Sequence, residues 1–143
     1  MRLRGLLILL LLALAPGAVA QAPAFSCVGA EQLEEDVFAI PFARGSAALT
    51  DAARTPLAAA EEALRAGPDR VACLLGHAGQ EGGATTSIRL AAERARAVAN
   101  ALAARGIARD RLRAEARSAQ FSPRVRAAEP PSRTVSIVVL PAP

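Results

Sequence analysis

The chain has 143 residues, the length of one ordinary domain, and 52% of them are hydrophobic, which is enough for a buried core. Only 3% are aromatic, with no Trp and no Tyr, and this composition argues against the stacking surfaces of single-stranded nucleic-acid binders. All 17 basic residues are arginines, so the isoelectric point near 10.8 reflects arginine chemistry, while the formal net charge at pH 7 is only +4.

The first 20 residues have the features of a secretory signal peptide. Two arginines precede an unbroken apolar run over residues 6–14, and Ala18-Val19-Ala20 matches the small-x-small pattern of a cleavage site. We therefore expect residues 1–20 to be removed, which leaves 15 arginines against 13 acidic residues, a net charge of +2. An uncleaved membrane anchor is the alternative, although this run is too short to cross a bilayer core of about 30 Å.

Export would place both cysteines in an oxidising compartment, where an even number favours a disulfide between Cys27 and Cys73. Such a bond closes a loop of about 46 residues and should stabilise the fold by about 4 kcal/mol. Lipidation of Cys27 is the alternative. It fits poorly, because the bulky Phe25 lies close to the cleavage point, and it would leave Cys73 unpaired.

The first predicted elements are a linker over 21–36, a strand over 37–42 and a helix. Apolar residues on both faces indicate the strand, and Pro41 places it at a sheet edge or strand end. The helix is indicated by an apolar stripe at helical spacing, with Thr50 as its N-cap and a stop at Gly67-Pro68. Pro56 implies a kink or a start at Thr55. The stripe consists of Leu49, Ala53, Leu57, Ala60 and Leu64.

The second half of the chain continues the alternation of strands and helices. The continuous apolar run 71–78 is typical of a central strand, and a polar, glycine-rich loop follows over 79–86. A second helix is predicted from about Ser87 to Arg105, then a half-exposed strand over 112–117, an irregular stretch over 119–133 and a strand over 134–140. The order β-α-β-α-β-β predicts an α/β fold, an α+β sandwich with two helices packed on a four-stranded mixed sheet.

Arg94 does not fit the core pattern of the second helix, because it lies one turn from both Leu90 and Val98 in the apolar sector. A buried unpaired charge is costly, so we expect this guanidinium to bind an anion, and its planar fork suits a carboxylate or phosphate. An internal ion pair, or a side chain that extends past the helix edge, is the alternative. Arg105 is near the same sector and is interpreted as a partner of the helix dipole.

His77 ends the second predicted strand and precedes the glycine-rich loop. A lone histidine is most often a hydrogen-bonded structural residue. The sequence has no second histidine and no reduced cysteine pair, so we expect neither a metal nor a cofactor. It also offers no nucleophile–base pair, and we therefore expect a protein that is not an enzyme.

Several stretches together carry a resemblance to a known family. They are Ile40-Pro41-Phe42-Ala43-Arg44-Gly45-Ser46-Ala47-Ala48-Leu49, Leu75-Gly76-His77-Ala78 and Leu90-Ala91-Ala92-Glu93-Arg94-Ala95, with Val98, Leu102, Gly106-Ile107 and Ser132-Arg133-Thr134-Val135. In this order they resemble the OmpA-like peptidoglycan-binding domain of OmpA C-terminal regions, peptidoglycan-associated lipoproteins and flagellar stator proteins. The resemblance implies an OmpA-like domain over residues 37–141.

The resemblance also implies a binding site for the diaminopimelate of the peptidoglycan stem peptide. In the family, an arginine of the helix binds the carboxylate and an aspartate after the His-Thr motif binds the ammonium. Arg94 matches that arginine, beside the motif residue His77. Gly79 stands at the position of the aspartate and Ser87 at that of a family asparagine, while Glu81 could replace the aspartate if the loop is rearranged.

Two hypotheses for the function follow. The first is a periplasmic protein of a Gram-negative cell envelope that binds peptidoglycan non-covalently, with association to the outer membrane left open. The second is a periplasmic structural or protein-interaction module with the same fold, which has lost diaminopimelate binding because the loop aspartate is absent. Under both we expect no nucleic-acid partner and no transmembrane segment in the mature chain, and other envelope proteins are further candidate partners.

Overall fold

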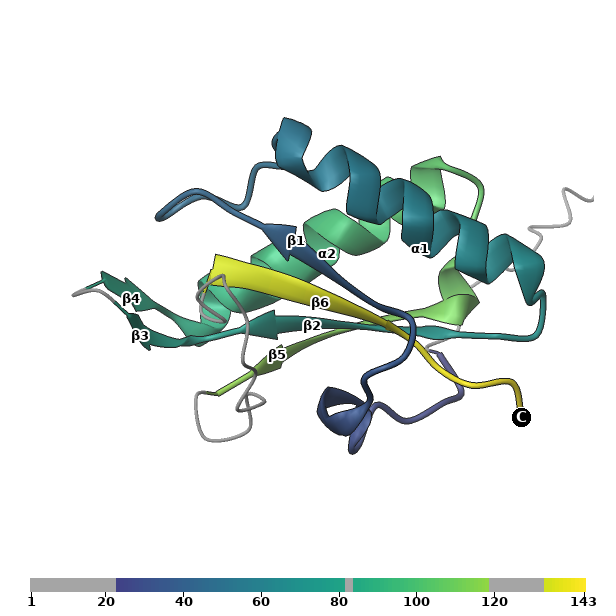
Figure 1. Ribbon diagram of the computed structural model, residues 1–143. Helices are drawn as coiled ribbons and strands as arrows, with labels where there is room; N and C mark the ends of the chain where they lie inside the picture. Colours follow the sequence, from purple (N-terminus) through teal and green to yellow (C-terminus); the bar gives the residue numbers. More distant parts are fainter. Residues whose placement is uncertain (1–22, 82–83, 119–132) are drawn as a thin grey trace, which may run out of the picture.

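The computed structural model describes residues 23–81, 84–118 and 133–143. Four strands form one mixed sheet, and two helices cover one of its faces (Figure 1). Strands β1 (Val37–Pro41), β6 (Thr134–Val139), β2 (Ala72–His77) and β5 (Leu112–Arg117) are neighbours in that order. Strand β6 is antiparallel to β1 and β2, whereas β2 and β5 are parallel. The predicted fold class is confirmed, while the predicted signal peptide lies outside the described residues.

The strands take the places that their composition indicates. All six residues of β2 are buried in the middle of the sheet. Strand β1 is at the edge, where its last residue, Pro41, pairs with Thr134 and is tolerated despite lacking an N–H group. Strand β5 forms the other edge, and only its first residue, Leu112, is fully buried.

Helix α1 (Arg54–Ala66) begins later than the apolar stripe suggested. Pro56 has no N–H for the carbonyl four residues earlier, so it occupies the first turn, and a short 3₁₀ helix, η2 (Asp51–Ala53), precedes α1. Thr50 is the N-cap residue of η2, without a side-chain capping bond. Leu57 and Leu64 are buried as expected, but Leu49 lies before both helices and is 37% exposed.

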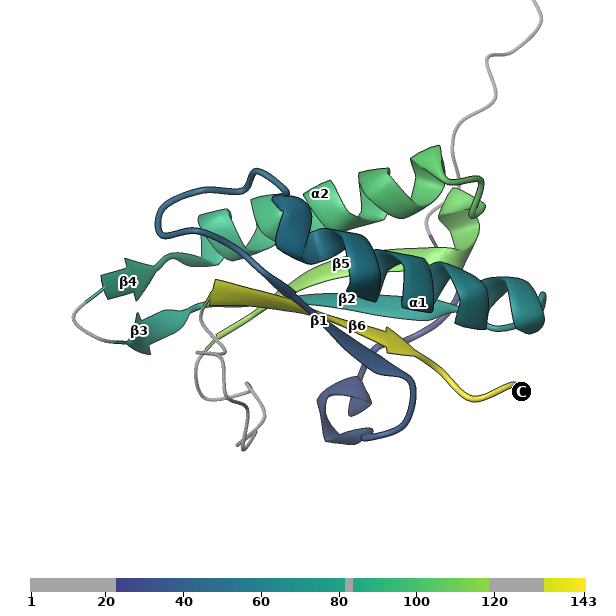
Figure 2. The same cartoon turned by 45° about the horizontal axis from the view of Figure 1, so that its top comes forward.

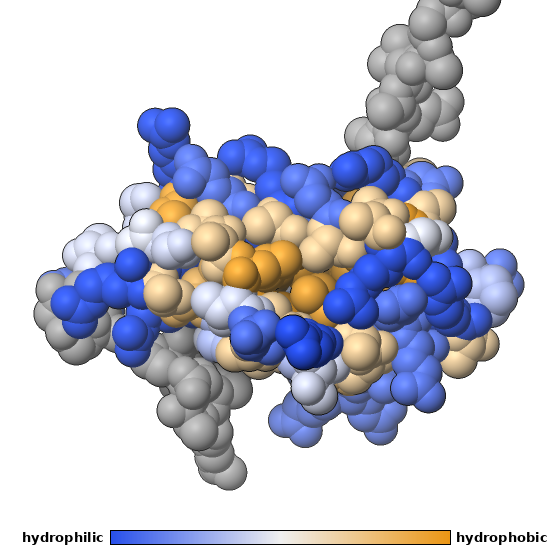
Figure 3. Space-filling view, turned by 90° about the horizontal axis from the view of Figure 1, so that it is seen from above, coloured by the Kyte–Doolittle hydropathy of each residue, from blue (hydrophilic) through white to orange (hydrophobic). Residues whose placement is uncertain are grey.

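Helix α2 (Ile88–Ala104) begins after Ser87, as predicted. It packs close to the sheet at Gly76, where a Cβ atom would lie 2.0 Å from the carbonyl oxygen of Ala91. Figure 2 shows both helices on the same side of the sheet. Viewed from that side, hydrophilic residues lie mainly around the rim and hydrophobic residues gather in the middle (Figure 3).

The loop predicted over 79–86 contains a short β-hairpin. Strand β3 (Gly79–Glu81) pairs antiparallel with β4 (Ala84–Thr86), and two glycines lie between them in the sequence. Gly-Gly between short polar segments favours a two-residue hairpin turn, and β-branched threonines favour the strand. The predicted irregular stretch lies almost wholly outside the described residues.

The segment before β1 packs on the sheet face opposite the helices (Figure 1). It contains a 3₁₀ helix, η1 (Ala30–Gln32), and the predicted disulfide from Cys27 to Cys73 of β2 is present. Cys27 and Cys73 form a small apolar cluster with Leu75 and Val138. The described part of the expected linker therefore covers part of the second sheet face.

Candidate functional site

The buried guanidinium of Arg94 is the centre of the candidate site. Arg94 is 1% exposed and is held by the segment that follows β1: its Nε donates to the carbonyl of Ser46 at 2.7 Å, and its Nη2 donates to the carbonyl of Ala43 at 3.0 Å. The guanidinium carbon lies 5.3 Å from the ring centroid of Phe42, within cation–π range. Helix α2 thus fixes the residues after β1 through one side chain.

Arg94 also faces the hairpin that precedes its own helix. Its Nη1 lies 3.5 Å from the hydroxyl of Thr86 in β4, which is a weak contact at most. Burial lowers the pKa of Arg94, and the charge of Arg133 lowers it further. An arginine nevertheless stays protonated in a protein, so the site carries a positive charge at neutral pH.

These contacts show how the described residues hold the side chain of Arg94. The sequence left open an anion, an internal ion pair or a side chain that reaches past the helix edge. In the structure, Arg94 is an internal residue that binds main-chain carbonyl groups. Carbonyl acceptors have no signature in the sequence, so the roles of Ala43 and Ser46 could not be predicted from residue type.

His77 is not part of the same cluster as Arg94. Along β2, Gly76 faces helix α2, so the next side chain, His77, faces the opposite side of the sheet. There His77 Nε2 lies 2.9 Å from the hydroxyl of Ser136. Burial, and then the charge of Arg117, lowers the pKa of His77 to about 4, so the ring is neutral at pH 7. A buried, hydrogen-bonded position of this kind is typical of a structural histidine.

The other predicted site residues belong to the hairpin and the start of α2. Gly79 begins β3 with φ of 152°, a conformation that a residue with a side chain rarely adopts. Ser87 is the N-cap of α2, and its hydroxyl accepts a hydrogen bond from the amide of Leu90 at 3.1 Å. Glu81 pairs with Ala84 at the hairpin end, and its side chain lies outside the described part of the chain.

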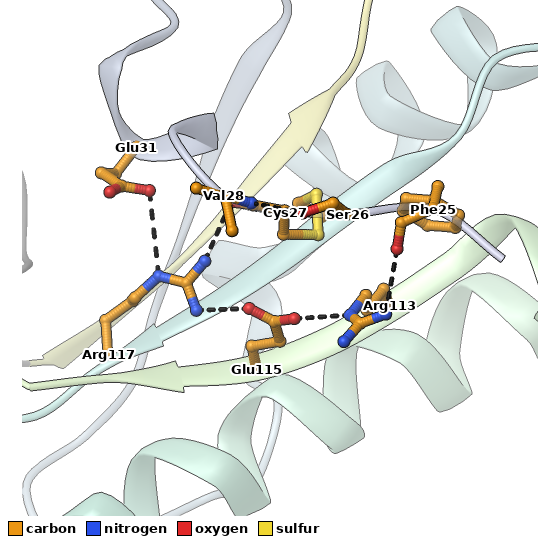
Figure 4. Close-up of polar contacts among 9 residues, drawn as sticks. Phe25, Ser26, Cys27, Val28, Glu31, Arg113, Glu115 and Arg117 are labelled. Atoms are coloured by element: carbon orange, nitrogen blue, oxygen red, sulfur yellow. Dashed lines mark hydrogen bonds and ion pairs between the residues drawn. A yellow bond between two sulfur atoms is a disulfide. The ribbon is translucent and has the colours of Figure 1, made fainter. Parts of the chain in front are cut away.

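A second polar cluster joins β5 to the segment before β1 (Figure 4). Arg113 donates to the carbonyl of Phe25 at 2.9 Å, and Arg117 donates to the carbonyl of Cys27 at 3.0 Å. Glu115 accepts hydrogen bonds from both arginines. Burial would raise the pKa of Glu115, but the hydrogen bonds from Arg117 and Arg113 outweigh it and lower that pKa. The sequence did not predict this cluster, because its acceptors include main-chain groups distant in sequence.

Arg105 has a partner that the sequence did not predict. It follows the last turn of α2, as expected, but its Nη1 pairs with Glu61 of α1 at 2.9 Å. Hydrogen bonds from Arg105 and then Arg65 lower the pKa of Glu61. Arg105 thus connects the two helices, in addition to any interaction with the dipole of its own helix.

Some candidate features have no counterpart in the described residues. Residues 23–81, 84–118 and 133–143 include no group of three metal-ligating side chains. Nor does this part of the chain contain a helix with the length and apolar character that a membrane crossing needs.

A comparison with known protein families assigns this chain to one of them. The model of the OmpA family matches residues 41–134, which is well over half of the chain, and the chain therefore belongs to the OmpA family. No curated protein matches the chain.

Solved structures of OmpA-like domains share the fold. The OmpA-like domain of FopA1 from Francisella tularensis aligns with a TM-score of 0.60 at 18% identity, covering 78% of this chain and 77% of that chain. The peptidoglycan-associated lipoprotein of Burkholderia pseudomallei aligns with a TM-score of 0.58 at 21% identity, covering 72% and 90%. The cell wall anchor of the T6SS from Pseudomonas aeruginosa aligns at 0.53 and 26% identity, covering 72% and 79%.

Proposed function

We propose that this protein is an exported, periplasmic domain that binds peptidoglycan non-covalently and uses Arg94 to hold a carboxylate of the stem peptide. Family membership supports the proposal, as does the shared fold of a lipoprotein described as peptidoglycan-associated. The observation that carries it is the fixed position of the Arg94 guanidinium. It lies where α2, the segment after β1 and the β3–β4 hairpin come together.

The two short hydrogen bonds to Arg94 favour a preorganised site. The carbonyls of Ser46 and Ala43 hold Nε and Nη2, so the orientation of the planar group is set before any ligand arrives. Binding to a fixed guanidinium costs less conformational entropy than binding to a flexible arginine, because the side chain is already ordered. A carboxylate matches the planar donor geometry of arginine better than it matches a lysine ammonium.

The ammonium of diaminopimelate has no matching acid at position 79. Gly79 occupies the place of the family aspartate, and its φ of 152° is unfavourable for any replacement with a side chain. Loss of a charge-assisted hydrogen bond in a binding site typically costs about 2 kcal/mol, or about 30-fold in affinity. We therefore expect recognition to rest on the carboxylate and to be weaker than with both partners present.

A second candidate function is a periplasmic structural or protein-interaction module in which Arg94 is purely structural. The same contacts favour it, because Arg94 already has acceptors at Ser46 and Ala43 inside the fold. The absence of an aspartate at position 79 also favours it. Under this function the fold would need Arg94, but peptidoglycan would not be a ligand.

Co-sedimentation with purified sacculi separates the two functions. The wild type is compared with Arg94→Lys, which keeps the positive charge but lacks the planar guanidinium group. The second variant is Arg96→Ala, which changes an exposed arginine of the same helix. Circular dichroism checks that each variant is folded. Peptidoglycan binding predicts that the wild type and Arg96→Ala sediment with sacculi, and that folded Arg94→Lys does not. A wild type that stays in the supernatant supports the second function.

Competition with free diaminopimelate tests the ligand, and export is tested separately. A carboxylate site predicts that diaminopimelate releases the protein from sacculi, whereas lysine methyl ester, which has amines but no carboxylate, does not. Mass measurement of the secreted protein checks removal of residues 1–20.

A further inference from the structure

The outer edge of β5 is an unpaired strand edge within the described part of the fold. Among the described strands, β5 pairs only with β2, and both views of the ribbon place it at the margin of the sheet (Figures 1 and 2). The amide of Ala78 donates to the carbonyl of Arg117 at 2.8 Å, so the main-chain groups of Arg117 face β2. Because these groups alternate along a strand, those of Ala114 and Ala116 face outward.

Exposed apolar side chains flank this edge on both sides. A hollow of about 500 Å³ is lined by Ile88 at the start of α2, by Val28 in the segment before β1, and by the end of β5. Val28 is 92% exposed and Ile88 is 51% exposed, although both are large hydrophobic residues. Figure 4 shows Val28 beside Arg117, on the sheet face opposite the helices. Strand addition occurs at exposed sheet edges, and exposed apolar side chains beside the edge add surface that a partner could bury.

The charges of β5 make this edge complementary to itself. The strand carries the pattern Arg113, Glu115, Arg117, with these side chains on one face. In an antiparallel pair of two copies, residues that face each other across the join lie on the same face. We propose that a second copy of this chain docks here, β5 against β5, with a twofold axis at Ala116.

Charge and the exposed apolar residues together favour this register. With the axis at Ala116, Glu115 of each copy lies opposite Arg117 of the other, and Ala116 lies opposite itself. With the axis at Glu115, two carboxylates would meet and Arg113 would lie opposite Arg117, and like charges directly opposite each other are destabilising. With the axis at Ala114, Arg113 would lie opposite Glu115, but the axis would be farther from Ile88 and Val28, which line one hollow with residues 115–118 at the end of β5.

The same register accounts for the exposed apolar residues. Ile88 and Val28 line the same hollow as Ala116, so an axis at Ala116 would place both copies of each side chain close to the join. Both side chains would lose exposure without any change of the fold. The join would continue the four-stranded sheet into one of eight strands, and it would leave Arg94 on the helix side of each copy unchanged.

Analytical ultracentrifugation of the purified mature chain, without peptidoglycan, tests the proposal. We expect a monomer–dimer equilibrium in the wild type. Ala116→Pro removes an N–H group that points away from β2, so the sheet is kept and the join is lost. We expect this variant, and Ile88→Asp, each to raise the dimer dissociation constant by about tenfold or more. Val37→Asp changes a similarly exposed hydrophobic residue in β1, at the opposite sheet edge, and should leave the constant unchanged.

Oxidative cross-linking tests the register. Paired residues that exchange hydrogen bonds in an antiparallel sheet have Cα atoms about 5.5 Å apart, which a disulfide spans. Ala116→Cys should therefore give a covalent dimer, whereas Arg96→Cys on the exposed side of α2 should not. A wild type that remains monomeric at millimolar concentration overturns the proposal, and so does a dimer that is unaffected by Ala116→Pro and Ile88→Asp. If only an extended peptide from another protein binds the edge, the second copy is the wrong occupant.

Discussion

The disulfide between Cys27 and Cys73 should supply a large part of the stability of this fold. The bond joins residues 46 positions apart, and both cysteines are buried. A cross-link that closes a loop of this length lowers the entropy of the unfolded chain enough to stabilise the folded state by about 4 kcal/mol. Small domains have a total stability of about 5–15 kcal/mol, so this loss is a large fraction of it, and the double variant Cys27→Ala/Cys73→Ala should unfold at a clearly lower temperature than the wild type.

Urea unfolding followed by circular dichroism measures this contribution. We expect the double variant to lose about 4 kcal/mol relative to the oxidised wild type, and to show a larger denaturant slope because its unfolded chain is more expanded. Reduction of the wild type should reproduce the loss, which separates the bond from the substitutions. Arg113 and Arg117 still hold the segment before β1 through its carbonyls, so the folded state should keep its native spectrum. A loss below about 1 kcal/mol would refute the loop-closure argument.

Further predictions concern the packing, the buried histidine and the end of α1. Gly76→Ala should destabilise the fold by about 3 kcal/mol in the same urea assay, because its Cβ would lie 2.0 Å from the main-chain carbonyl of Ala91 and α2 would have to move. Burial lowers the pKa of His77 to about 4, from about 6.5 in the unfolded chain. The contribution of neutral His77 to the free energy of unfolding should therefore be fully present above pH 6.5, and about 3 kcal/mol should be lost as the pH falls from 6.5 through 4. His77→Gln should remove that part of the pH dependence, and an unchanged profile would contradict the assignment. Arg111→Ala should cost about 2 kcal/mol, because Arg111 donates to three main-chain carbonyls at 2.7 to 2.9 Å, whereas the exposed Arg109→Ala should cost less than about 0.5 kcal/mol. Equal losses of stability in Arg111→Ala and Arg109→Ala would contradict this prediction.

The sequence predicted the elements whose signals are local. The apolar run of β2, the Ser87 cap of α2 and the proline in the first turn of α1 each depend on a few neighbouring residues. They gave the element order and the fold class. The β3–β4 hairpin was missed because its strands have three residues each, too few to show a clear alternation of polar and apolar side chains.

The candidate site was only partly predictable. An arginine in an apolar stripe identified Arg94 as unusual, and this placed the site on α2. Its acceptors among the described residues include the carbonyls of Ala43 and Ser46, which every residue type could provide. His77 adjoins the site in sequence, but the pleat of β2 sends its side chain to the other sheet face. The sequence predicted the disulfide that holds the segment before β1. The pairing of two cysteines does not specify which face of the sheet the segment covers.

The most direct test of the central claim is the fraction of purified protein that co-sediments with sacculi. The account predicts that the wild type and Arg96→Ala bind, that diaminopimelate releases them, and that a folded Arg94→Lys variant remains in the supernatant. Equal sedimentation of the wild type and the folded Arg94→Lys variant would contradict it.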